Sequence, residues 1–67
     1  MTLEKAKELR VGDEVLLRNG TTMVITYIKL DVVEGFNSKG WITSPTLESI
    51  IWTTGKHYNL PIKEEII

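Results

Sequence analysis

The sequence predicts a mostly β domain, a small barrel of about five short strands preceded by a short helix. Of the 67 residues, 21 are Val, Ile or Thr, whose branched side chains favour strands, and only one is Ala. Asn19-Gly20 separates two runs rich in apolar and β-branched residues, which is the strongest short-range signal for a β-hairpin. Further Gly- and Pro-containing turns divide the rest of the chain into short segments, as is typical of directly connected strands.

The N-terminal segment, residues 2–9, has the pattern of a helix of about two turns. Thr2 is a candidate N-cap, and Leu3, Ala6 and Leu9 recur at three-residue spacing along one stripe. The charged residues between them form ordinary surface pairs on the other side. We expect this helix to cover one end of the barrel with its charged face in solvent.

The hairpin consists of residues 14–18 and 21–28, and two registers compete for it. A two-residue turn at Asn19-Gly20 pairs Val15 and Leu17 with Thr22 and Val24. A three-residue loop that includes Arg18 places Gly20 in the left-handed conformation of a G1 bulge. We favour the second register because it gathers the apolar residues on one face: Val15, Leu17, Met23, Ile25 and Tyr27.

The second half of the chain predicts three further strands. The first two, residues 32–36 and 41–43, flank a turn at residues 37–40, and Pro45 ends their pairing because it has no N–H to donate. Residues 46–49 are either a loop or a single helical turn with Thr46 as its cap. Residues 50–53 are a strand, a tight turn follows at Thr54-Gly55, and residues 56–59 continue on its far side. This arrangement predicts a small SH3-like barrel, with an OB-like barrel as the alternative.

Length and composition restrict the class of protein. A single domain of 67 residues buries a small core, and with no Cys it has neither a disulfide nor a thiolate metal site, so we expect a homo-oligomer. The absence of Cys also fits the cytoplasm. No apolar run approaches 18 residues and the N-terminus has no h-region, so we expect no membrane span and no secretory signal.

Two resemblances follow from particular motifs. Val11-Gly12-Asp13-Glu14-Val15, followed by a Gly-containing turn and a β-branched strand, resembles the opening of SH3-like barrels, including KOW-type modules. The longer pattern resembles small uncharacterised proteins of bacteriophages and prophages, through Gly35-Phe36, Gly40-Trp41 and the sequence Trp52-Thr53-Thr54-Gly55-Lys56-His57-Tyr58, before an acidic and apolar tail. The second resemblance implies an accessory phage protein of the kind that acts against host defence, in the cytoplasm of the host cell.

Catalytic chemistry has little support in the sequence. There is one His and no Cys, so neither a metal site nor a nucleophilic triad is indicated, and no serine lies in a nucleophile-elbow pattern. Glu64 and Glu65 are adjacent, so on a strand they point to opposite faces rather than forming an acid–base pair. We expect a protein that is not an enzyme and that needs no cofactor.

The residues that favour a binding site are aromatic and basic. Tyr27 and Phe36 are expected in the core, whereas each Trp lies beside a predicted turn, near the rim of the barrel. Indole rings beside cations would make a pocket that stacks on a base and pairs with a phosphate. The alternative is that both Trp side chains fill the core or a subunit interface. The candidate ligand-binding set is Trp41, Trp52, Lys39, Lys56, His57 and Tyr58.

These observations predict a non-catalytic binding protein that captures a host protein or a small nucleotide-like ligand. The alternative function is a nucleic-acid-binding module of the KOW or SH3-like kind. That module would need a basic stripe, but the formal net charge of the chain is −1, whereas nucleic-acid binders are usually basic. The candidates for such a stripe are Arg10, Arg18, Lys29, Lys39 and Lys56.

Overall fold

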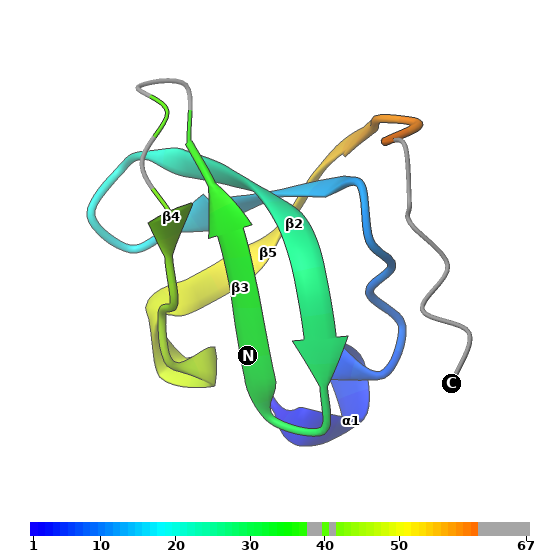
Figure 1. The fold of residues 1–67 in the computed structure, drawn as a ribbon. Coiled ribbons are helices and arrows are strands. Elements are labelled where there is room, and N and C mark those ends of the chain that lie inside the picture. The colour runs from blue at the N-terminus through cyan, green and yellow to red at the C-terminus, as the bar shows by residue number, and fades with distance from the viewer. Residues whose placement is uncertain (38–39, 41, 61–67) are drawn as a thin grey trace.

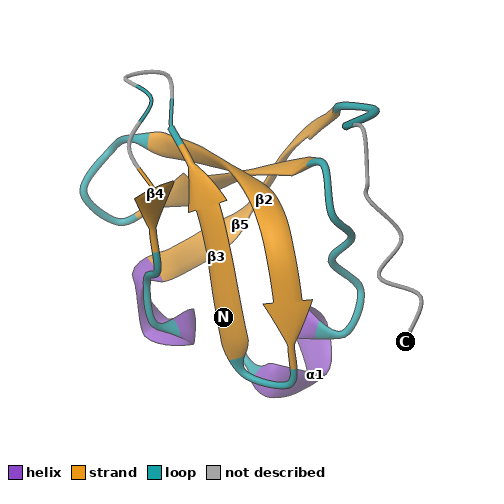
Figure 2. Ribbon diagram, in the orientation of Figure 1, coloured by secondary structure: helices purple, strands orange, loops and turns teal. Residues whose placement is uncertain are grey.

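The structure, a computed structural model, describes residues 1–37, 40 and 42–60. It confirms the mostly β class, with five antiparallel strands in one sheet and one short helix near the N-terminus (Figures 1 and 2). The strand order is β4-β3-β2-β1-β5, so β4 and β5 are the edges. Among the described residues, β4 and β5 do not pair with each other, so the strand pairings do not close the sheet into a barrel. The elements are α1 (Leu3–Ala6), β1 (Asp13–Leu17), β2 (Thr22–Lys29), β3 (Val32–Phe36), β4 (Ile42–Thr43), the 3₁₀ turn η1 (Leu47–Ser49) and β5 (Ile50–His57).

The β1–β2 hairpin adopts the second of the two predicted registers. Val15 pairs with Met23, the Leu17 amide donates to the Thr21 carbonyl at 2.8 Å, and the Gly20 amide donates to the Leu17 carbonyl at 3.0 Å. The loop therefore has three residues, and Gly20 has the positive φ of 92° that a G1 bulge requires. Four aliphatic side chains of the predicted apolar face are buried in the core: Val15, Leu17, Met23 and Ile25.

Two aromatic residues expected in the core are instead exposed. Thr26 is an extra residue in β2, because Ile25 pairs with Gly35 whereas Tyr27 pairs with Glu34, the next residue of β3. This bulge turns Tyr27 to the outer face of the sheet. Phe36 follows Gly35, whose position faces the core, so the Phe36 side chain also points outward.

The core lies between the inner face of the sheet and the N-terminal segment. Thr2 caps α1 as predicted, since its hydroxyl oxygen accepts a hydrogen bond from the Lys5 amide at 3.2 Å. The helix is shorter than the predicted residues 2–9. Ala6 and Leu9 are nevertheless buried, and Leu9 joins the core cluster, while Leu3 is exposed. No helix of the described residues is long and apolar enough to cross a bilayer.

The predicted turn at Thr54-Gly55 is wrong, because β5 runs without a break from Ile50 to His57. Val15 of β1 pairs with Thr53 and Asp13 pairs with His57, so three residues of β5 lie opposite one residue of β1. Gly55 has a φ of 94°, which lets this irregular segment bulge within the strand. Trp52 consequently lies inside a strand rather than beside a turn.

The connection from β3 to β5 is partly as predicted. The strand expected at residues 41–43 is present as β4, although Trp41 lies outside the described residues. Residues 46–49 form a single turn with Thr46 at the N-cap position, but the Thr46 hydroxyl pairs with the Ser49 hydroxyl at 3.1 Å instead of capping a backbone amide.

Candidate functional site

The buried carboxylate of Asp13 bonds to several groups at the junction where β1 begins and β5 ends. Asp13 is paired with His57 in the ladder, and its side chain accepts from the Arg10 amide through Oδ2 at 3.0 Å. The His57 Nδ1 lies 2.7 Å from Asp13 Oδ1. A carboxylate only accepts hydrogen bonds, so Nδ1 is the donor and the His57 ring is fixed with its Nε2 edge away from Asp13.

A depression of about 190 Å³, here called the polar pocket, lies beside this pair. Two of its cations reach it from different segments: Arg10 precedes β1, and Lys56 belongs to the bulge of β5. The Arg10 guanidinium is 3.7 Å from Asp13 Oδ1 but mostly exposed, so this ion pair leaves it available to a ligand. The lining residues are Glu8, Arg10, Asp13, Trp52, Thr53, Gly55, Lys56 and His57.

Trp52 contributes an aromatic ring to the polar pocket and is half-buried against the core cluster. The ammonium of Lys5, on α1, lies 5.4 Å from the centroid of its ring, within the range of a cation–π contact. The Trp52 ring thus has a cation over its face, but this cation is Lys5, which was not among the predicted ones. A ligand that stacks on this side of the ring has to displace Lys5, whose charge can then pair with an anionic group of the ligand.

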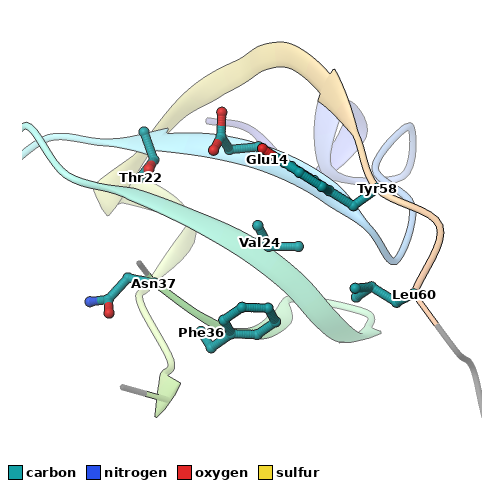
Figure 3. Close-up of a pocket in the computed structure, with 7 residues that line it drawn as sticks. All are labelled: Glu14, Thr22, Val24, Phe36, Asn37, Tyr58 and Leu60. Carbon is teal, nitrogen blue, oxygen red and sulfur yellow. The ribbon is translucent and has the colours of Figure 1, made fainter. Parts of the chain in front are cut away.

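A second depression, here called the apolar groove, lies on the other face of the same strands (Figure 3). Glu14 follows Asp13 in β1 and so points to the opposite face, and Tyr58, the residue after β5, lines the same groove as Glu14. Figure 3 shows Val24 in the middle of the set, with Phe36 and Leu60 on one side of it and Glu14 and Tyr58 on the other. The groove has a volume of about 270 Å³ and is lined by Glu14, Thr22, Val24, Phe36, Asn37, Tyr58 and Leu60.

Gly12 precedes the two residues of β1 that line the polar pocket and the apolar groove, and its backbone bonds to β2 and to the residue after β5. Its amide donates to the Ile25 carbonyl and its carbonyl accepts from the Tyr58 amide, both at 2.8 Å. Its φ is 101°, and a Cβ added there would lie 2.1 Å from the Tyr58 carbonyl oxygen. Only glycine allows β2 and the residues after β5 to approach so closely at this point.

The structure brings some of the predicted ligand-binding residues together in one depression. Trp52, Lys56 and His57 all line the polar pocket, whereas Tyr58 lines the apolar groove. Lys39 and Trp41 lie outside the described residues. Prediction from sequence did not include Lys5, Arg10 and Asp13 in the site. Asp13 was noted only as part of the motif at residues 11–15, and nothing in the sequence indicates that α1 carries Lys5 over Trp52.

The polar pocket brings cationic and acidic side chains together in equal number. Its cations are Arg10 and Lys56 and its acids are Glu8 and Asp13, and the charge of Asp13 is already engaged by Arg10 and His57. In the described part of the chain, no three His, Asp or Glu side chains gather closely enough to hold a metal ion.

No protein-family model matches the chain, and no curated protein or solved structure matches it either.

Proposed function

We propose that this chain is a non-catalytic binding protein whose polar pocket captures a small, anionic, nucleotide-like ligand. The observation that carries the proposal is the convergence of Trp52, Lys56 and His57, predicted as ligand-binding residues, with Arg10 around one depression. An aromatic ring beside a fork-shaped guanidinium and a mobile ammonium is the combination that recognises a base and a phosphate together.

The size of the polar pocket limits how much of a ligand it encloses. About 190 Å³ is below the roughly 300–1,000 Å³ of pockets that surround a drug-sized molecule. The proposed ligand therefore places its phosphate between Arg10 and Lys56, with its base against Trp52 and much of its surface in solvent. Lys5 moves from the Trp52 ring to the ligand's anionic part.

The resemblance to small phage proteins supplies the context for this binding. A phage protein that sequesters a nucleotide signal in the cytoplasm of its host would counter a defence that depends on that signal. A host protein as the captured partner is the other form of the same proposal.

The basic residues favour a small ligand over a nucleic acid. Arg10 and Lys56 line the polar pocket, but Arg18 lies beyond the opposite end of β1, where its Nε donates to the Glu48 carbonyl at 2.6 Å. Lys29 lies at the end of β2. Among the described residues, the candidate cations thus do not line up as the stripe that a phosphate backbone would follow.

Native mass spectrometry of the protein, purified from cells that express it, tests the proposal by reporting a retained small molecule. Titration calorimetry with ADP and with adenosine then measures what the phosphates contribute. We expect ADP to bind at least tenfold more tightly than adenosine, Lys56→Gln to weaken ADP binding about tenfold, and Glu8→Gln to strengthen it, because the Glu8 carboxylate repels the anion.

Arg18→Gln is the matched control, because it removes the same charge outside the polar pocket. If Arg18→Gln weakens ADP binding as much as Lys56→Gln does, the attraction is non-specific and the pocket is not the site. Absence of both a retained ligand and ADP binding would shift the proposal to a protein partner.

A further inference from the structure

The outer face of the sheet is apolar although it lies outside the core. Strand pairing places Val24 of β2, Phe36 of β3 and Ile42 of β4 in one row across three strands. Tyr27 pairs with Glu34 in the next row and Lys29 with Val32 in the one after it. Five apolar side chains thus share this surface, here called the outer face: Val24, Tyr27, Val32, Phe36 and Ile42. The apolar groove is continuous with it through Val24 and Phe36.

Exposed large apolar side chains are gathered on the outer face rather than spread evenly over the surface. The described residues include eight exposed large apolar side chains, and four of them belong to the outer face, while Tyr58 lines the adjoining groove. These five are between 36% and 81% exposed, and Ile42 is the most exposed of all. An antiparallel sheet with one face in water ordinarily alternates apolar and polar residues, so apolar side chains on both faces indicate that both are covered.

The apolar area suits a small protein–protein interface. An aromatic side chain has roughly 150–250 Å² of surface to bury, so the five side chains at these exposures present on the order of 400 Å² of apolar surface. A specific interface needs roughly 500 Å² on each partner, of which a little over half, about 280 Å², is apolar. The outer face together with Tyr58 of the adjoining groove exceeds this requirement.

We propose that a second copy of this chain covers the outer face, so that two sheets pack face to face in a symmetric dimer. In such a dimer each patch meets an identical patch, so a side chain that projects from one copy has to meet a hollow on the other. Ile42 is the projection and the apolar groove is the hollow. They lie about two strand spacings, roughly 10 Å, apart on the same face, so a two-fold axis between them brings each Ile42 to the partner's groove.

The charges at one end of the outer face suit the same arrangement. Glu34 and Lys29 have opposite signs and occupy adjacent rows on adjacent strands. A two-fold axis along β3 moves each Lys29 to the opposite side of the axis, within reach of the partner's Glu34. The polar pocket points away from this face, so the dimer keeps both pockets open to ligand.

Sedimentation equilibrium of the full chain across micromolar to millimolar concentration tests the dimer. We expect the wild-type mass to rise to twice that of the monomer, and Ile42→Asp to raise the dimer dissociation constant at least tenfold. Leu3→Asp is the matched control, because it places the same charge on an exposed apolar position of α1 and should leave the constant within twofold.

A wild-type chain that stays monomeric overturns the proposal, and so does an oligomer that Ile42→Asp leaves unchanged or that Leu3→Asp weakens equally. If circular dichroism shows that Ile42→Asp is unfolded, Ile42→Thr replaces it, with an expected increase of a few-fold. The charge arrangement is tested separately: Lys29→Glu should weaken the dimer, and adding Glu34→Lys should restore it. Failure of this rescue overturns the two-fold axis along β3.

Discussion

The two faces of the β1–β5 junction are built from consecutive residues and have opposite chemistry. Asp13 and His57 face the polar pocket, and the Asp13 carboxylate is buried with an amide, an imidazole and a guanidinium around it. Glu14 and Tyr58, one residue further along, face the apolar groove, where the Glu14 carboxylate accepts a hydrogen bond from the Thr54 hydroxyl at 2.6 Å. A single position in the chain therefore separates the polar pocket from the apolar groove at this junction.

Gly12→Ala is expected to have the largest effect, because it damages both faces at once. The added Cβ would collide with the Tyr58 carbonyl in a left-handed backbone conformation, so we expect a loss of roughly 3 kcal/mol in the free energy of unfolding. Urea denaturation measures it. Gly20→Ala is the control, since Gly20 has the same sign of φ but open space around it, and should lose only about 1 kcal/mol. Equal losses would show that backbone strain, not the collision, dominates.

Asp13→Ala should damage the polar face alone. It leaves the Arg10 amide and the His57 ring without their buried acceptor, which costs about 2 kcal/mol of unfolding free energy and frees the ring. Asp13→Asn should cost about half as much, since its oxygen can accept from Arg10 while its amide group donates to the other tautomer of His57. Urea denaturation measures the free energies of unfolding of the two variants, and nitrogen NMR identifies the tautomer of His57. If His57 keeps a protonated Nδ1 in Asp13→Asn, this account of the pair is wrong.

Val24→Thr is expected to have the smallest effect on stability while still separating the role of the apolar groove from that of the polar pocket. It keeps the branched shape in the middle of the apolar groove but adds a hydroxyl, so we expect less than about 1 kcal/mol of destabilisation. Self-association should weaken a few-fold in sedimentation while ADP binding in calorimetry stays unchanged. A parallel loss of both would mean that the two faces are coupled through β1.

Local sequence signals predicted those parts of the fold that depend on neighbours in the chain. Asn19-Gly20 and the apolar alternation around it predicted the hairpin register, and Thr2 predicted the N-cap of α1. The errors come from bulges. Thr26 and the segment at residues 54–56 insert unpaired residues into otherwise regular strands, and only the pairing partner determines whether a Gly such as Gly55 makes a turn or a bulge.

The candidate site was predictable only in part, for a related reason. Trp52, Lys56 and His57 are close in sequence, so a single aromatic and basic segment indicated them together. Lys5 and Arg10 enter the site from the N-terminal segment, and their contribution depends on how α1 packs against the sheet. Tyr58 was assigned to the same site by proximity in the chain, but it follows the end of β5 and lines the apolar groove instead.

The connection between β2 and β3 contains a leucine where glycine would be favoured. Leu30 has a φ of 55°, a left-handed conformation that costs a residue with a Cβ about 1 kcal/mol. Leu30→Gly should therefore raise the melting temperature by roughly 5 °C in a domain of this size. Leu30→Ala, the control, keeps the Cβ and should leave the melting temperature nearly unchanged; an equal rise in both would assign the cost to the exposed side chain instead.

The same position offers a route to distance measurements. Leu30 is 79% exposed and the chain contains no Cys, so Leu30→Cys would introduce a single thiol at a known point of the fold. A spin label or a fluorophore attached there would be unique in each protomer. Two such labels in a symmetric pair report one distance, which restrains how the two sheets can pack on each other without a crystal.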